Sequence, residues 1–348
     1  MPTTPLPNAP VNLALQGGGA HGAFTWGVLD ALLEDGQLDF EGVSGTSAGA
    51  MNAVCLAQGL MVGGRDGARE ALARFWTAVA ESSPFPDSGN AGGEPPAIPA
   101  ALKLMLQWTE YLSPEQLNPF DLNPLRDVLG AQIDFERLRK HSPVKLFIAA
   151  THANSGKLRI FHNHELSVDA LLASACLPTI HRTVMIDGEP YWDGGYSANP
   201  AVFPLFYDCT AADILLVLLT PLHFGETPDS AQDIRMRLRE LGFSATFLRE
   251  MRMFAHLRER VGESRLPAWL QAWIPVGQLE QRVRQVRFHA ITADALMSEL
   301  PPETKLAASL SFFQRLRDDG REHARAWLAT RRSAIGRRST LDLAKIYY

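Results

Sequence analysis

Two glycine-containing turns, each between a predicted strand and a predicted helix, constrain this 348-residue chain most strongly. The first spans residues 17–22 (Gly-Gly-Gly-Ala-His-Gly) and follows an apolar run at 11–15. The second spans residues 45–49 (Gly-Thr-Ser-Ala-Gly) and lies between residues 40–44 and an apolar helical stretch. Repeated strand-turn-helix units are typical of a parallel sheet covered by helices. We therefore expect a three-layer α/β fold, with a mainly parallel central sheet and helices on both faces.

Ser47, at the centre of the second turn, is a candidate nucleophile. A serine on a strained strand-to-helix turn holds its hydroxyl clear of the backbone, and the small neighbours Gly45 and Gly49 avoid clashes in the bend. The alternative is a serine that only caps the following helix. The strand and helix on either side favour the nucleophile.

The glycine turn at 17–22 also has the Gly-x-Gly-x-x-Gly spacing of a dinucleotide-binding loop. Such a site needs an acidic residue at the far end of the second strand to hold the ribose. Here Asp39 and Glu41 lie at the near end of that strand, and the far end carries Ser47. A phosphate-binding P-loop is excluded because no Lys-Ser or Lys-Thr pair follows the glycines.

With these two alternatives set aside, the glycine turn is predicted to form an oxyanion hole, in which unpaired backbone N–H groups point at a developing negative charge. We expect Gly18, Gly19 and Ala20 to supply the donors. Gly17 and Gly22 belong to the same predicted oxyanion hole.

Asp193 is the candidate base for Ser47. Residues 186–196 are typical of a hairpin around the Asp187-Gly188 turn, ending in Asp193 followed by Gly194 and Gly195. The paired glycines let other backbone pack close to the carboxylate. The alternative role for Asp193 is that of a turn residue or helix cap.

In order, residues 15–22, 45–49 and 193–195 resemble the patatin-like phospholipases, whose sites use a Ser-Asp dyad without a histidine. Residues 173–178 and 199–200 also match, so the resemblance covers about 11–205. It implies a serine acyl hydrolase acting on a lipid or other acyl ester, with Ser47 as nucleophile, Asp193 as base, and no cofactor or metal. Many relatives have arginine where this chain has His21, so we expect a group that titrates near neutrality beside the oxyanion hole.

Two alternatives stay open. A conventional catalytic triad would recruit a histidine, for which His152, His162, His164 and His181 are the candidates. A non-catalytic lipid-binding or scaffold protein could also keep the same fold, although the intact Ser47 and Asp193 argue against it.

The chain is expected to comprise a flexible N-terminus (1–10), a catalytic core (11–225) and a helical C-terminal extension (226–348) packed on or beside the core. Strands are predicted near residues 11–16, 40–45, 144–151, 158–162 and 213–220. Residues 82–100, rich in Pro, Gly and Ser, favour a surface loop or a lid over the site. The apolar stretch at 102–112 is typical of a helix that packs in the core or walls an acyl-chain pocket.

Charge and cysteine content bound the cellular context. A net charge of −5 gives no electrostatic reason to expect nucleic acid. The three cysteines, Cys55, Cys176 and Cys209, have no metal-ligand spacing and are predicted to be free thiols in a reducing compartment. With neither a signal peptide nor a membrane-spanning apolar run predicted, we expect a cytoplasmic protein with at most peripheral membrane contact.

Residues 234–261 are typical of an amphipathic helix, broken near Gly242, with seven arginines among apolar residues. The pattern fits a surface helix with its apolar face on the core. It also fits a helix lying on anionic lipid, with Trp269 and Trp273 at the interface and a basic stretch at 331–338 adding attraction.

Overall fold

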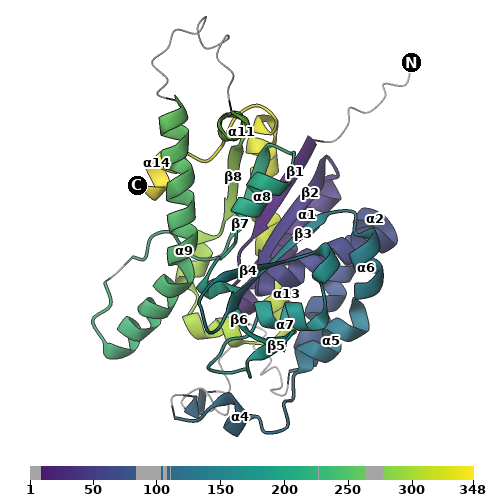
Figure 1. The fold of residues 1–348 in the computed structure, drawn as a ribbon, viewed down its shortest axis with the longest axis vertical. Helices are drawn as coiled ribbons and strands as arrows, with labels where there is room; N and C mark the ends of the chain where they lie inside the picture. Colours follow the sequence, from purple (N-terminus) through teal and green to yellow (C-terminus); the bar gives the residue numbers. More distant parts are fainter. Residues whose placement is uncertain (1–8, 84–102, 105–107, 110, 226, 263–276) are drawn as a thin grey trace, which may run out of the picture.

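The computed structural model of this chain describes residues 9–83, 103–104, 108–109, 111–225, 227–262 and 277–348. Its centre is an eight-stranded sheet in the order β5-β6-β3-β2-β1-β7-β8, with β4 paired to β3 (Figure 1). The strands β3, β2, β1, β7 and β8 run parallel, while β4, β5 and β6 form antiparallel pairs. Their bounds are β1 Ala9–Leu15, β2 Leu38–Thr46, β3 Lys145–His152, β4 Leu158–His162, β5 Val184–Ile186, β6 Glu189–Asp193, β7 Asp213–Leu218 and β8 Arg287–Thr292.

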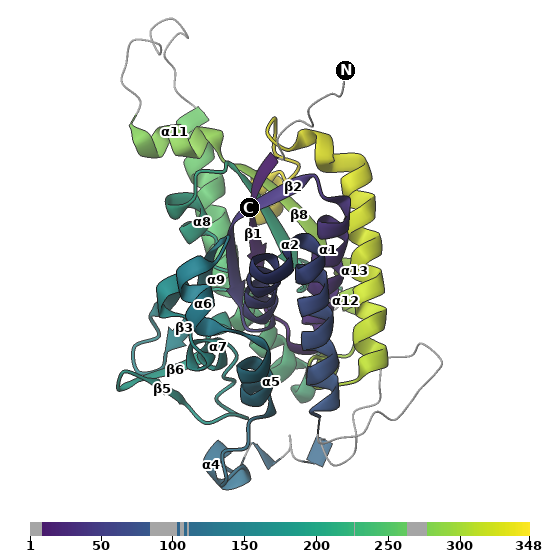
Figure 2. The ribbon, with the colours of Figure 1, turned by 90° about the vertical axis from the view of Figure 1, so that its right-hand side faces the viewer.

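Helices cover both faces of the sheet, which confirms the expected three-layer α/β fold (Figure 2). One face carries α1 (Gly22–Asp35), α2 (Ala48–Glu81), α5 (Pro124–Gln132), α6 (Phe135–His141), α7 (Val168–Ser174) and α13 (Leu310–Arg331). The other carries α8 (Phe203–Asp208), α9 (Ala231–Gly262), α11 (Gln278–Gln285) and α14 (Leu343–Tyr347). The short elements are α4 (Pro114–Leu117), α12 (Asp294–Glu299) and the 3-10 turns η1 (Gly19–His21), η2 (Asn163–Glu165), η3 (Gly194–Tyr196), η4 (Pro302–Leu306) and η5 (Arg332–Ala334).

The alternation of side chains along each strand divides the core into two layers. In β7, Leu215 and Val217 pack with α1, α2 and α13, whereas Ile214, Leu216 and Leu218 pack with α8, α9 and α14. All five are buried, as expected for a central strand of a parallel sheet covered on both sides.

The segment after residue 226 contributes a strand as well as helices. β8 pairs in parallel with β7 and extends the same sheet, although the sequence predicts only helices there. Its first and third residues, Arg287 and His289, are polar and interrupt the apolar run that would predict a buried strand. Both bind Asp213 at the start of β7, Arg287 through two contacts of 3.0 and 2.8 Å and His289 Nε2 at 2.9 Å.

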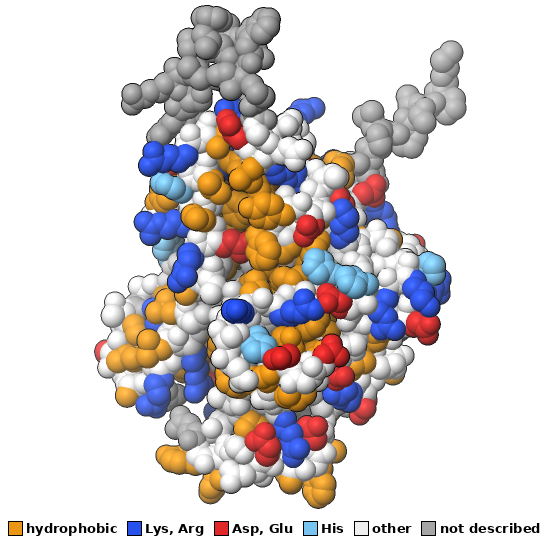
Figure 3. Space-filling model, viewed as in Figure 1, with side chains coloured by type: hydrophobic (Ala, Val, Ile, Leu, Met, Phe, Trp, Pro, Cys, Tyr) orange, Lys and Arg blue, Asp and Glu red, His pale blue; other side chains and the backbone are white. Residues whose placement is uncertain are grey.

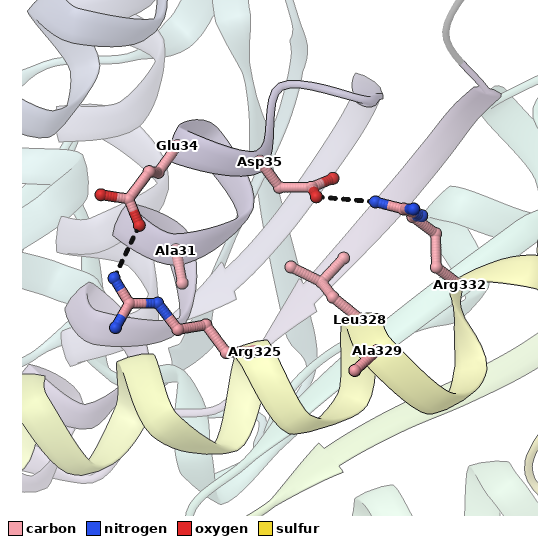
Figure 4. Close-up of a pocket in the computed structure, with 7 residues that line it drawn as sticks. All are labelled: Ala31, Glu34, Asp35, Arg325, Leu328, Ala329 and Arg332. Atoms are coloured by element: carbon pink, nitrogen blue, oxygen red, sulfur yellow. Dashed lines mark hydrogen bonds and ion pairs between the residues drawn. The ribbon is translucent and has the colours of Figure 1, made fainter.

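The packing of α13 on α1 fastens the C-terminal segment to the core. A β-carbon on Gly27 would collide with the Arg317 carbonyl, and one on Gly320 with the Phe24 carbonyl, so the two backbones touch. Salt bridges continue this contact at the end of α1, where Glu34 pairs with Arg325 at 2.8 Å and Asp35 with Arg332 at 2.7 Å, around a surface hollow (Figure 4).

The structure tests several of the predictions made from the sequence. The five predicted strands are all present, and the Asp187-Gly188 hairpin turn is confirmed, with φ of 53° and 82°. The arginine-rich segment forms α9, which runs through Gly242 without the expected break. The loop at 84–100, most of the stretch at 102–112, and Trp269 and Trp273 lie outside the described residues. The three cysteines are buried free thiols.

Candidate active site

The two glycine turns meet at the carboxyl ends of two neighbouring strands. β1 leads into the glycine loop, β2 leads into Ser47, and Leu15 pairs with Gly45 in register. In open α/β sheets, ligands bind at this edge. The third motif reaches the same edge because β6 pairs with the end of β3, where Ala150 lies opposite Asp193.

Ser47 stands in a strained backbone conformation between β2 and α2, with φ 53° and ψ −122°. Such values are rare for a residue with a side chain and occur at functional turns. Ser47 remains half-buried while its neighbours on both sides are buried, so its side chain is accessible. The N–H of Ser47 donates to Ser174 Oγ at 3.0 Å, which holds the turn.

The small residues around Ser47 are required by close packing. A β-carbon on Gly45 would lie 2.5 Å from the Gly49 carbonyl oxygen. One on Gly49 would collide with the backbone of Leu15, and one on Gly17 would lie 2.9 Å from Ser47 Cβ. The turn therefore packs directly against the glycine loop.

The backbone amides of the glycine loop fall into two groups. Gly17 donates to Asn199 Oδ1 at 2.7 Å, and Gly22 donates within the turn to the carbonyls of Gly19 and Ala20. These two amides are engaged and shape the loop. For the amides of Gly18, Gly19 and Ala20, no acceptor is recorded in the part of the chain that the structure describes. They begin the 3-10 turn η1, where an intrahelical acceptor does not exist.

Asp193 is buried at the end of β6, and the Ser47 side chain lies close enough to its carboxylate to lower its pKa. Its Oδ1 accepts the N–H of Gly195 at 2.7 Å, while its own N–H donates to the carbonyl of Cys176 at 2.8 Å. A β-carbon on Gly194 would collide with the Ala149 carbonyl of β3, so only glycine permits this approach.

Burial raises the pKa of Asp193 to about 7, against the opposing effect of the hydrogen bonds from Gly195 and Ser47. Loss of hydration disfavours the charged form of a carboxyl group. A carboxylate with a pKa near neutrality is a much stronger base than an exposed aspartate. The fold therefore brings a hydroxyl close to a carboxylate whose basicity is raised by burial.

Three polar side chains that support this arrangement have no role assigned by the sequence reasoning. Gln16 accepts from the N–H groups of Leu219 and Thr220 at 2.5 and 2.8 Å, which fixes the start of the glycine loop to the end of β7. Asn199 and Ser174 hold Gly17 and Ser47, as described above. The matches at 173–178 and 199–200 were the signal that could have found Ser174 and Asn199.

His21 does not behave as the sequence suggested. It is buried, and burial together with the charge of Lys305 lowers its pKa to about 3. The imidazole is therefore neutral and does not titrate near neutrality beside the glycine loop. Its Nε2 lies 2.8 Å from Thr304 Oγ1.

Of the four histidines proposed for a triad, His152, His162 and His164 lie in other interactions. His152 binds Ser155 through Nδ1 at 2.8 Å and Glu189 through Nε2 at 2.6 Å. His162 and His164 stack on each other with centroids 6.1 Å apart. Across the described ranges, no histidine is recorded as a hydrogen-bond partner of Ser47 or Asp193.

The described residues contain no group of three or more His, Cys, Asp or Glu side chains arranged to hold a metal ion. None of their helices combines the length and apolar composition needed to cross a bilayer.

In a comparison with protein-family models, the patatin-like phospholipase model matches residues 13–206, which contain all three motifs. A search of curated proteins finds no match.

Among solved structures, VipD from Legionella pneumophila aligns over 93% of this chain and 67% of VipD, at 15% identity and a TM-score of 0.40. The type III effector ExoU aligns over 94% of this chain and 54% of its own, at 17% identity and a TM-score of 0.33. This chain thus spans about half the length of that ExoU structure. A chain of the ExoU-SpcU complex from Pseudomonas aeruginosa aligns over 94% of this chain and 76% of its own length, at 17% identity and a TM-score of 0.29.

Proposed function

This chain belongs to the patatin-like phospholipase family, and we propose that it is a serine acyl hydrolase that cleaves lipid acyl esters through Ser47 and Asp193. The observation that carries the proposal is the placement of Ser47 beside the buried carboxylate of Asp193, whose pKa is raised by burial to about 7. A base with a pKa near the working pH is the most effective proton acceptor.

In the proposed reaction, Ser47 Oγ attacks the ester carbonyl carbon while its proton passes to Asp193. The negative charge that develops on the carbonyl oxygen is stabilised by N–H groups of Gly18, Gly19 and Ala20. The intermediate then collapses, and the alcohol leaves with the proton from Asp193. Water attacks the acyl-enzyme with Asp193 again as base, which releases the fatty acid and restores Ser47.

The glycines have separate roles in this proposal. Gly17 and Gly22 shape the loop, because their N–H groups are already engaged. Gly45 and Gly49 permit the turn at Ser47, and Gly194 and Gly195 permit the turn after Asp193. We propose residues 11–225 as the catalytic core and the segment after 226 as an extension that completes the sheet.

Labelling with a fluorophosphonate probe tests the proposal. The intact protein should gain one adduct, mapped by peptide mass spectrometry to Ser47, and Ser47→Ala should lose both labelling and hydrolysis of p-nitrophenyl esters. Ser44→Ala is the matched control, since Ser44 lies buried on β2, the strand that leads to Ser47, and its hydroxyl has no hydrogen-bond partner among the described residues. An unlabelled wild-type protein without esterase activity would instead support a non-catalytic lipid-binding role.

A further inference from the structure

The glycine loop is held from outside the catalytic core by η4. His21, the last residue of η1, places its Nε2 2.8 Å from Thr304 Oγ1. The Thr304 hydroxyl donates its single proton to the Pro301 carbonyl at 2.6 Å, so it can only accept from His21. The proton of the imidazole is therefore on Nε2, and the bond has a fixed direction.

A second contact joins η4 to the same loop. Gly19 has φ 57°, and a β-carbon there would collide with the carbonyl of Lys305. Gly19 and His21 are the two ends of η1, the turn that begins with the free amides. Thus η4 fixes both ends of the turn that would bind the oxyanion.

The aspartate turn is held by α9 in a similar way. Gly195, whose N–H binds Asp193, lies directly under the ring of Phe243, and a β-carbon on Gly195 would collide with that ring. The rings of Phe243 and Tyr196 are 4.6 Å apart. Phe243 therefore covers the turn that orients the carboxylate.

The two contacts are linked to each other. Lys305 in η4 pairs with Glu240 in α9 at 3.7 Å, and Glu240 lies one helical turn before Phe243. Both α9 and η4 lie outside residues 13–206, where the family model matches. The two elements are therefore a feature of this chain beyond its family core.

We infer that α9 and η4 form a brace that sets the geometry of the site, with Thr304 positioning the oxyanion loop and Phe243 positioning Asp193. This inference rests on the proposed function. A brace of this kind acts on the transition state, because the free amides and the carboxylate must both be aligned when charge develops. Substrate binding depends on it much less.

Thr304→Val tests the first half of the brace, because valine keeps the shape and removes the hydroxyl. For a soluble p-nitrophenyl ester we expect kcat to fall by about tenfold or more, as for other losses of alignment, with KM changed less than about twofold. Fluorophosphonate labelling should slow by a similar factor. Thr304→Ser, which restores the hydroxyl, should recover most of both rates.

A matched control exists at the other end of the sheet. Thr340 Oγ1 lies 3.0 Å from His289 Nδ1, a second Thr-His pair in the same C-terminal segment, beside Asp213 at the start of β7. Thr340→Val should lower stability as much as Thr304→Val does, while kcat stays at the wild-type value. A loss of kcat in both variants would reduce the effect to general destabilisation and overturn the inference.

Phe243→Ala tests the second half and remains informative if Thr304→Val does not fold. Removing the ring admits water to the Asp193 turn, so the midpoint of the kcat–pH profile should move from about 7 toward acid values, and kcat should fall. The titratable neighbours Cys176 and Tyr196 have raised pKa values and stay neutral in this range. Met253→Ala, at an exposed position of α9, is the control and should change neither kcat nor the midpoint of its pH profile.

The outcomes separate this inference from the proposed function. If Ser47 is labelled and required, but Thr304→Val and Phe243→Ala keep the wild-type kcat and pH midpoint, the brace is wrong and the proposed reaction stands. If the wild-type protein is neither labelled nor active, the proposed function itself fails.

Discussion

Ser47 and Asp193 interact with each other although they reach the site at the ends of different strands, β2 and β6. Ser47 is half-buried and accessible, whereas Asp193 is fully buried behind it. This asymmetry matters because the nucleophile must meet the substrate, while the base gains strength from the loss of water around it. The same burial makes the ionised carboxylate costly for the folded protein.

Asp193→Asn should lose activity by about 10²- to 10⁴-fold, since an amide cannot accept the proton. Its Oδ1 can still accept the N–H of Gly195, so the turn should persist. Steady-state hydrolysis of a p-nitrophenyl ester measures the loss. Asp187→Asn, in the exposed hairpin turn, is the matched carboxyl-to-amide control and should retain full activity. A nearly normal rate for Asp193→Asn would show that another residue is the base.

The same pair of variants should reveal a cost in stability. The pKa of Asp193 is raised from 3.8 to about 7 in the folded protein, so the folded state holds its proton more tightly than the unfolded state. The stabilisation is therefore full below about pH 4 and is lost as the pH rises to about 7. The asparagine of Asp193→Asn cannot ionise, so this loss does not affect the variant. Between about pH 4 and pH 7, the free energy of unfolding of the variant minus that of wild type should therefore increase by up to about 4 kcal/mol. Denaturant unfolding at pH 5 and pH 8 tests this, and Asp187→Asn should show no such trend.

The rate of hydrolysis should follow the ionisation of Asp193. We expect kcat to rise with pH and level off above an apparent pKa of about 7, because only the ionised carboxylate accepts a proton. His152→Gln serves as a control for a candidate of the alternative triad, since His152 lies on β3 opposite Tyr191 of β6. An unchanged profile in that variant assigns the midpoint to Asp193, whereas a dead variant would favour a triad.

Gly19→Ala should abolish activity, because it forces a left-handed conformation on alanine and drives a β-carbon into the Lys305 carbonyl. The oxyanion donors would then be displaced. Gly36→Ala is the control, since Gly36 also has a positive φ, of 71°, but its nearest atoms would be 3.9 Å away. That variant should lose about 1 kcal/mol of stability with full activity. An active Gly19→Ala enzyme would remove the loop from the mechanism.

The fold and the central motifs could be predicted because they depend on local patterns. The glycine loop, the turn at Ser47 and the Asp187-Gly188 hairpin each show in a short stretch of sequence, and the apolar run of β7 marks a buried strand. The structure places these motifs at one edge of one sheet. Their catalytic roles remain predictions.

What the sequence did not indicate depends on contacts between distant segments. The strand β8 is hidden because its polar residues are satisfied by Asp213, 74 and 76 positions away. The neutral state of His21 depends on its burial under η4. Because η4 lies nearly 300 positions later in the chain, the residues next to His21 in the sequence do not indicate this burial. The engagement of the Gly17 amide by Asn199 is hidden for the same reason.

The apolar face of α9 packs on the core through Phe247, Met251 and Phe254, which confirms the surface-helix interpretation. Ile234, Leu238 and Leu241, near its start, are exposed instead. Figure 3 shows Lys and Arg side chains along the edge of the molecule over α9, beside a band of hydrophobic side chains. This side of the molecule is therefore the one to test for contact with a lipid surface.

Transient attachment to anionic membranes is therefore the last prediction, with exposed Arg249 and Arg252 as the cations to test. Each arginine near an anionic surface contributes about 1 kcal/mol, and salt screens this attraction beyond a Debye length of about 8 Å. Sedimentation with phosphatidylserine vesicles should exceed that with phosphatidylcholine vesicles and fall as salt is added. Arg249→Glu/Arg252→Glu should weaken binding strongly, while the control Arg126→Glu/Lys140→Glu, with the same change in net charge on α5 and α6, should weaken it less. Equal losses in both variants would make net charge the cause, and no binding at low salt would leave the α9 arginines as a solvated surface.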